Sequence, residues 1–147
     1  MTQEQNDLLL KDLCSRLDTN LVCSIYRTDD EGVGYRDEIL HGYCKGDIWY
    51  EFYFREDCSI GIDDVSKIKP YLFSLSSMTE EQKNDLIKNL KSNISVKNEE
   101  ISFWNLYTAN RIDQWKWVFE WCDKNHFDYR GLIPMGLAIN ATGLNIY

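Results

Sequence analysis

The sequence predicts an α+β fold: a small, mainly antiparallel β-sheet with N-terminal, central and C-terminal helices packed on it. Three strand-like segments follow one another between residues 21 and 54, and helical patterns flank this block instead of alternating with it. Elements in that order favour hairpin-connected strands covered by helices. All 147 residues are expected to form a single domain, because no linker divides the chain and a chain of this length buries about two-thirds of its unfolded surface.

The N-terminal helix has a defined start. The segment Thr2-Gln3-Glu4-Gln5 fits a capping box, in which the side chains of Thr2 and Gln5 each bond a backbone amide at the helix start. The helix is expected to end near residues 18–20. Its apolar face consists of Leu10, Leu13, Cys14 and Leu17.

Three strands are expected, at residues 21–27, 35–43 and 48–54. The first two show the two-residue alternation of a strand, and the acidic, glycine-bearing segment 28–34 predicts a hairpin loop between them. The third is apolar on both faces except at Glu51, which predicts a central or doubly covered strand.

The middle of the chain is predicted to contain a short helical turn and a second helix. Asp63 or Asp64 can cap a turn through residue 68, which Pro70 cannot extend. Thr79 and Gln82 form a second capping box, which opens a helix. The residues expected to face inward on this helix are Leu86, Ile87 and Leu90.

Two less regular segments come next. The polar run 92–100 predicts a flexible connection, and residues 101–107 have the ambiguous pattern of a further strand.

A tryptophan-rich helix is expected at residues 111–124, and we expect the other elements to pack against it. Three of the five tryptophans lie here, and Asn125 suits the left-handed conformation that ends many helices. The residues at three- and four-residue steps along one side are Ile112, Trp115, Val118, Phe119 and Cys122.

Composition excludes several classes of protein. The chain has 24 acidic and 16 basic residues and a net charge of -8, which argues against direct binding to a nucleic-acid backbone. No apolar stretch approaches the roughly 20 residues of a membrane helix, and the N-terminus lacks a secretory signal. Five cysteines without a C-x-x-C pair predict reduced thiols in a cytoplasmic protein.

The segment after the tryptophan helix holds the best candidates for a binding site. His126 has a pKa suited to proton transfer, and Arg130 can grip a phosphate or carboxylate through two parallel hydrogen bonds. With Asp128 and Tyr129 they could face one cleft. The competing interpretation is that Asp128 and Arg130 tether the loop, or that Arg130 pairs with another carboxylate, while Phe127 and Tyr129 pack.

Trp117 and Trp121 lie one helical turn apart and off the main apolar side. They are therefore candidates for a wall of the same cleft, where an aromatic plane would stack on a nucleotide base. The predicted binding residues are thus Arg130, His126, Asp128, Tyr129, Trp117 and Trp121.

The sequence predicts no metal centre and no cofactor. Only two histidines exist, His41 and His126, and the acidic segments lack the ligand spacing of a calcium loop. No nucleophile elbow, phosphate loop or dinucleotide fingerprint occurs.

Four stretches have distinctive sequences: residues 9–17 (LLKDLCSRL), 68–72 (IKPYL), 75–81 (LSSMTEE) and 125–138 (NHFDYRGLIPMGLA). They resemble an uncharacterised family encoded by gut Bacteroidales, their phages and mobile elements. Residues 93–111 and 140–143 depart from the pattern. The family carries no activity to transfer, so the resemblance implies a setting: a small accessory protein in the cytoplasm of a bacterial host, of phage or mobile-element origin.

These observations favour a non-enzymatic intracellular binding protein over an enzyme. In the phage setting it would sequester a small anionic or nucleotide-like signalling molecule, or engage a host defence protein. One alternative is a small hydrolase that uses His126 and Asp128 as acid and base. Another is an acidic mimic of nucleic acid, and a homo-oligomer is left open.

Overall fold

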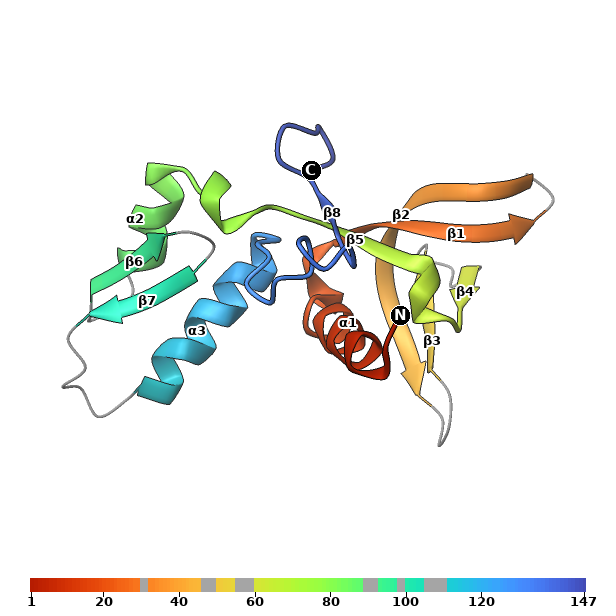
Figure 1. Cartoon of the computed structure of the whole chain (residues 1–147), viewed down its shortest axis with the longest axis horizontal. Helices are drawn as coiled ribbons and strands as arrows, with labels where there is room; N and C mark the ends of the chain where they lie inside the picture. The colour runs from red at the N-terminus through yellow and green to blue at the C-terminus, as the bar shows by residue number, and fades with distance from the viewer. Residues whose placement is uncertain (30–31, 46–49, 55–59, 89–92, 98–99, 105–110) are drawn as a thin grey trace.

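The structure, a computed structural model of the chain, describes residues 1–29, 32–45, 50–54, 60–88, 93–97, 100–104 and 111–147. The described residues form a six-stranded sheet, in the order β4-β3-β2-β1-β5-β8, a separate two-stranded pair and three α-helices (Figure 1). All neighbours in the larger sheet are antiparallel except β5 and β8. The predicted α+β class is confirmed.

The strands of the larger sheet are β1 (Val22–Asp29), β2 (Gly32–Lys45), β3 (Tyr50–Phe54), β4 (Ile60–Ile62), β5 (Ile68–Leu72) and β8 (Ile139–Asn140). The first three correspond to the three predicted strands, and the start of the third prediction, residues 48–49, lies outside the described residues. The predicted loop 28–34 was too long, since Thr28 pairs with Val33 and Asp29 with Gly32. The side chains of Val33 and Tyr35 continue the two-residue strand period into that segment.

The sequence prediction missed β5. Asp64 does cap a short 3-10 turn, Val65–Lys67, by accepting a hydrogen bond from the Ser66 amide at 3.0 Å. The chain then becomes a strand, in which Pro70 lies opposite Cys23 of β1. β5 places Phe73, the residue after it, beside the end of the last helix.

The N-terminal helix α1 (Gln3–Ser15) covers one face of the sheet (Figure 1). Its predicted capping box is confirmed, with Thr2 N donating to Gln5 Oε1 at 2.9 Å and Gln5 N to Thr2 Oγ1 at 3.2 Å. Leu9 and Leu13 are buried, and the predicted residues Leu10, Cys14 and Leu17 pack at the edge of this core. The core also contains Leu21, Cys23, Ile25, Leu40, Phe52, Phe54, Ile68 and Leu72.

A second core joins the central helix α2 (Glu80–Lys88) to the C-terminal helix α3 (Arg111–Lys124). The second capping box is confirmed, since Thr79 N donates to Gln82 Oε1 at 2.9 Å and Gln82 N to Thr79 Oγ1 at 3.2 Å. This core contains Leu75, Met78, Leu86, Val118, Trp121, Cys122 and Phe127.

The apolar side predicted for α3 is partly wrong. Val118 and Cys122 are buried as expected, but Phe119 is 37% exposed and Trp121 is only 8% exposed. The reason is the position of α2: the indole of Trp121 donates to Asp85 of that helix at 2.8 Å. The side of α3 that carries residues 118, 121 and 122 therefore meets α2.

The predicted connection at residues 92–100 is mostly strand. β6 (Asn93–Lys97) and β7 (Glu100–Trp104) form an antiparallel pair, with Ile94 opposite Phe103 and Val96 opposite Ile101. The alternation of Ile94 and Val96 is a strand signal that the surrounding polar residues conceal. The prediction of a strand at 101–107 is confirmed up to Trp104, and residues 105–107 lie outside the described part.

Candidate functional site

The loop after α3 is fixed by the backbone of Phe73, the residue that follows β5. His126, and not Asn125 as predicted, takes the left-handed conformation that ends the helix, with φ of 58°. The Phe73 amide donates to the His126 carbonyl at 2.8 Å, and the Asp128 amide donates to the Phe73 carbonyl at 2.9 Å. These two bonds fix the backbone of His126 and Asp128 beside Phe73.

Asp128 tethers the following turn. One carboxylate oxygen accepts from the Leu132 amide at 2.9 Å and the other from the Ile133 amide at 2.8 Å. The side chain is buried. The tether interpretation of Asp128 is therefore confirmed.

His126 is buried and packs against the C-terminal segment. Its ring stacks on Tyr147 with centroids 4.0 Å apart and planes 7° from parallel. Burial, with a smaller effect from Arg16, lowers the pKa of His126 to about 4. Its imidazole is consequently neutral near pH 7, and its Nδ1 atom has no hydrogen-bond partner among the described residues.

Arg130 binds carboxylates from two helices. Its Nη1 atom donates to Asp12 of α1 at 2.6 Å and to Asp123 of α3 at 3.2 Å. Its guanidinium carbon lies 4.3 Å from the centre of the Tyr129 ring, a cation–π distance. The expectation that Arg130 pairs with a carboxylate is borne out, and Asp128 is not that partner.

Arg16 is a central residue that sequence reasoning missed. It is fully buried and binds Asp12 through Nε at 2.9 Å and Nη2 at 3.1 Å. It also donates to the Asp123 carbonyl at 3.2 Å and the Phe127 carbonyl at 2.9 Å, where the end of α3 leaves carbonyls without helical partners. The four-residue spacing of Asp12 and Arg16 on α1 was the available signal.

Asp12, Arg16, Asp123 and Arg130 together form a charge cluster with two positive and two negative groups. Burial works to lower the pKa of Arg16, but Asp12, Asp123 and Tyr129 together outweigh burial, and the pKa is raised. Burial raises the pKa of Asp123, although both arginines oppose the shift. The cluster is thus a neutral polar connection between α1, α3 and the loop.

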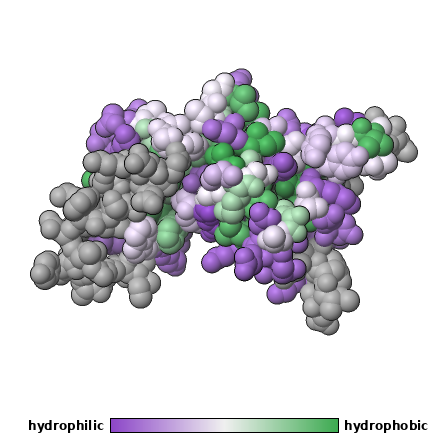
Figure 2. Space-filling model, viewed as in Figure 1, coloured by the Kyte–Doolittle hydropathy of each residue, from purple (hydrophilic) through white to green (hydrophobic). Residues whose placement is uncertain are grey.

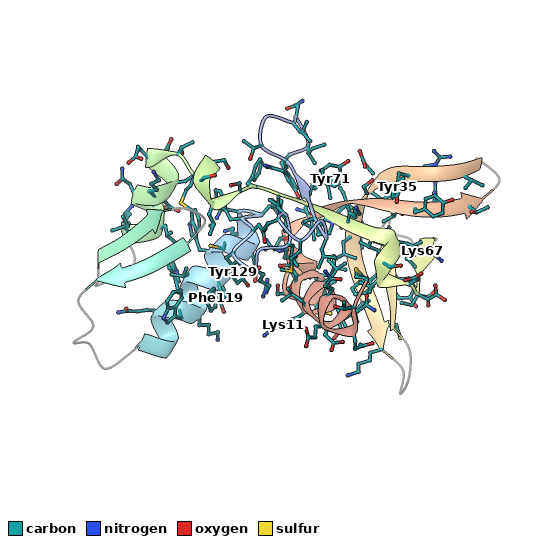
Figure 3. The ribbon with its side chains drawn as sticks, in the orientation of Figure 1. Lys11, Tyr35, Lys67, Tyr71, Phe119 and Tyr129 are labelled. Carbon is teal, nitrogen blue, oxygen red and sulfur yellow. The ribbon has the colours of Figure 1, made fainter. Side chains whose placement is uncertain are left out.

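An open groove of about 800 Å³ lies beside this cluster, between α1 and α3. α1 contributes Leu8 and Lys11 to its lining, which are three residues apart and so share a helix face. The loop contributes Tyr129 and Arg130. Figure 3 shows Phe119 and Tyr129 on the α3 side of the groove and Lys11 on the α1 side.

α3 supplies the aromatic wall of the groove. The Trp115 and Phe119 rings are 5.3 Å apart and 28° from parallel, and Phe119 and Tyr129 are 4.8 Å apart and 14° from parallel. These three rings form a column that ends at the guanidinium of Arg130. The other residues that α3 contributes are Lys116, Glu120 and Asp123.

The groove carries more positive than negative groups. Its lining has three cations (Lys11, Lys116, Arg130) and two carboxylates (Glu120, Asp123), hence 3 − 2 = +1. Lys116 and Glu120 lie 3.7 Å apart, and Asp123 is held in the charge cluster. Lys11 has no ion pair among the described residues.

No protein-family model, curated protein or solved structure matches this chain.

The structure separates the residues predicted to share a cleft. Of these, Arg130 and Tyr129 line the groove, whereas His126 does not, and Asp128 lines a different cavity of about 260 Å³. Trp117 is half-buried against the second core and Trp121 is buried, so neither lines the groove. The rings that do line it, Trp115 and Phe119, were assigned to the core by the helical pattern.

Two further observations concern the described residues. Within the described ranges, no group of three or more histidine, cysteine or acidic side chains could hold a metal ion. The helices in those ranges are all too short or too polar to cross a membrane.

Figure 2 shows hydrophobic surface in the middle of one face, where α1 and the C-terminal segment meet.

Proposed function

We propose that this is a non-enzymatic binding protein and that its ligand occupies the groove between α1 and α3. The observation that carries the proposal is a column of three aromatic rings beside cations, in a protein with a net charge of -8. In the phage or mobile-element setting that the sequence resemblance implies, the ligand would be a nucleotide-like signalling molecule or a segment of a host defence protein.

The size and chemistry of the groove support binding. Its volume lies within the roughly 300–1,000 Å³ of small-molecule sites, which combine aromatic walls with a few polar groups. No serine, cysteine or histidine is among the described residues that line it, so the lining offers neither a serine nor a cysteine nucleophile with a histidine base.

The geometry supports the hydrolase alternative less well. A general acid and base must reach the substrate within hydrogen-bond distance. His126 is stacked beneath Tyr147, and both oxygens of Asp128 accept bonds from backbone amides. Acidic mimicry of nucleic acid rests on the net charge alone.

Native mass spectrometry of protein purified from bacterial cells tests the proposal. The wild-type chain is compared with Phe119→Glu, which places a charge in the groove, and with Ile39→Glu, which changes a similarly exposed residue on β2. We expect a ligand mass on the wild-type and Ile39→Glu proteins, its loss from Phe119→Glu, and no chemical conversion of added ligand. Conversion of the ligand, or its retention by Phe119→Glu, would contradict the proposal. The same spectra report the oligomeric state.

A further inference from the structure

We infer that the ligand is a small molecule with a planar ring and one phosphate-like group, and that this group binds between Lys11 and Arg130. The inference rests on the proposed function and specifies the ligand of the same groove. Within the groove, the ring would lie against the aromatic wall of α3, and the anion would lie at the end where α1 meets the loop.

Both cations line the groove. Asp12, the residue that follows Lys11, holds the Nη1 atom of Arg130 at 2.6 Å. That bond places the guanidinium beside the turn of α1 that carries Lys11. The Nε and Nη2 atoms of Arg130 have no acceptor among the described residues, and the arginine side chain remains 13% exposed. These two atoms can therefore donate to an anion without releasing either aspartate.

The aromatic wall provides the other half of the site. Phe119 is 37% exposed although it stacks between two rings, so part of its surface still faces solvent. A flat ring placed on such a surface gains roughly 1–3 kcal/mol in nucleic-acid complexes. The chemistry of the wall does not distinguish one base from another, since every base has an aromatic face.

The number of cations sets the charge of the ligand. Lys116 is already near Glu120, and the charge of Arg130 is balanced in the charge cluster. Lys11 therefore supplies the net positive charge for an incoming anion, and the outer atoms of Arg130 supply hydrogen-bond donors. They match a single phosphate. Each further phosphate would add charge near Glu120 in a protein that is already strongly negative.

Calorimetric titration with adenosine, adenosine 5′-monophosphate and inorganic phosphate tests this inference. We expect the wild-type protein to bind the monophosphate about tenfold more tightly than adenosine, the scale of one partly exposed charge-assisted contact. Lys11→Ala should weaken binding of the monophosphate about tenfold and leave the affinity for adenosine within about twofold. Lys88→Ala, which removes an exposed lysine from α2, should leave both affinities unchanged. The preference for the monophosphate should decrease as salt increases.

The outcomes separate this inference from the proposed function. Equal affinity for adenosine and its monophosphate, or equal weakening of both by Lys11→Ala, would overturn the anion site and leave ring binding in the groove intact. Absence of binding by both would overturn the inferred ligand class, and the mass spectra of wild-type and Phe119→Glu proteins would then decide the proposed function independently. Arg130 is left unchanged because its substitution would also disturb the charge cluster.

Discussion

Replacing Asp12 by alanine should lower the free energy of unfolding by about 3–5 kcal/mol, the range for losing one partner of a buried ion pair. Asp12 is fully buried. Its two oxygens accept bonds from Arg16 at 2.9 and 3.1 Å and from Arg130 at 2.6 Å. Without this carboxylate, two guanidinium groups share the single carboxylate of Asp123.

The magnitude follows from these three contacts. A hydrogen bond to a charged group contributes about 1.5–3 kcal/mol, so three of them set an upper range of about 4.5–9 kcal/mol. Two features reduce the loss: Arg16 keeps its backbone carbonyl acceptors, and Arg130 is partly exposed to water. The remaining 3–5 kcal/mol is a large share of the roughly 5–15 kcal/mol that stabilises a typical domain.

Urea denaturation measures the effect, with Asp7→Ala as the matched control on an exposed part of α1. The control should change stability by no more than about 0.5 kcal/mol. The double variant Asp12→Ala/Arg16→Met removes one charge of each sign, so its loss should be smaller than the sum of the single losses by at least about 1 kcal/mol. If Asp12→Ala costs less than about 1 kcal/mol with an unchanged urea dependence, water reaches the cluster and the reasoning is wrong.

Three further predictions concern other parts of the molecule. Trp121→Phe should lower the free energy of unfolding by about 1–2 kcal/mol, because it removes the hydrogen bond from the indole to Asp85. Urea denaturation measures this change, and a difference within about 0.3 kcal/mol would contradict the contact. Burial lowers the pKa of His126 from 6.5 to about 4, so between these values the unfolded chain binds a proton that the folded chain does not. The stabilising effect of this neutral histidine is therefore complete above about pH 6.5 and lost as pH falls towards 4, and His126→Asn should flatten the dependence of Tm on pH in that window. Cys44 is exposed and should react with an alkylating reagent in the native protein. Cys122 should react only after unfolding, because burial raises the pKa of its thiol to about 12. Peptide mass spectrometry distinguishes the two cysteines, and labelling of Cys122 in the native protein would refute its burial.

The three α-helices and the strands β1, β2, β3 and β7 could be predicted because their signals are local. The capping boxes at Thr2 and Thr79 need only side chains three residues apart. Residues 111–124 were predicted as a helix with the bounds that the structure gives. The segment at β6 was mispredicted because only Ile94 and Val96 carry the strand pattern there, and the polar residues around them favour a loop.

The candidate site was harder to predict because it depends on contacts between distant elements. The helical pattern identified Phe119 as a core residue, but α2 packs on another side of α3 and leaves Phe119 in the groove. Nothing local to residues 111–124 shows which helix will approach from which side. Arg130 was identified as a binding residue because a guanidinium can bind an anion wherever it lies in the sequence. Its partner Asp12 was not identified, because it lies 118 residues away in the sequence.

The buried guanidinium of Arg16 has a consequence for how the chain folds. Its carbonyl acceptors lie 106 to 111 residues further along the chain. During synthesis, α1 and the first strands leave the ribosome well before these acceptors exist, so Arg16 must stay hydrated and α1 cannot yet settle fully on the sheet. Contacts of such long sequence separation slow folding and leave apolar surface open in the meantime. A nascent chain stalled before residue 122 should therefore expose the apolar face of α1 to chaperones. Once about the last 25 residues have been synthesised, α1 should pack fully on the sheet.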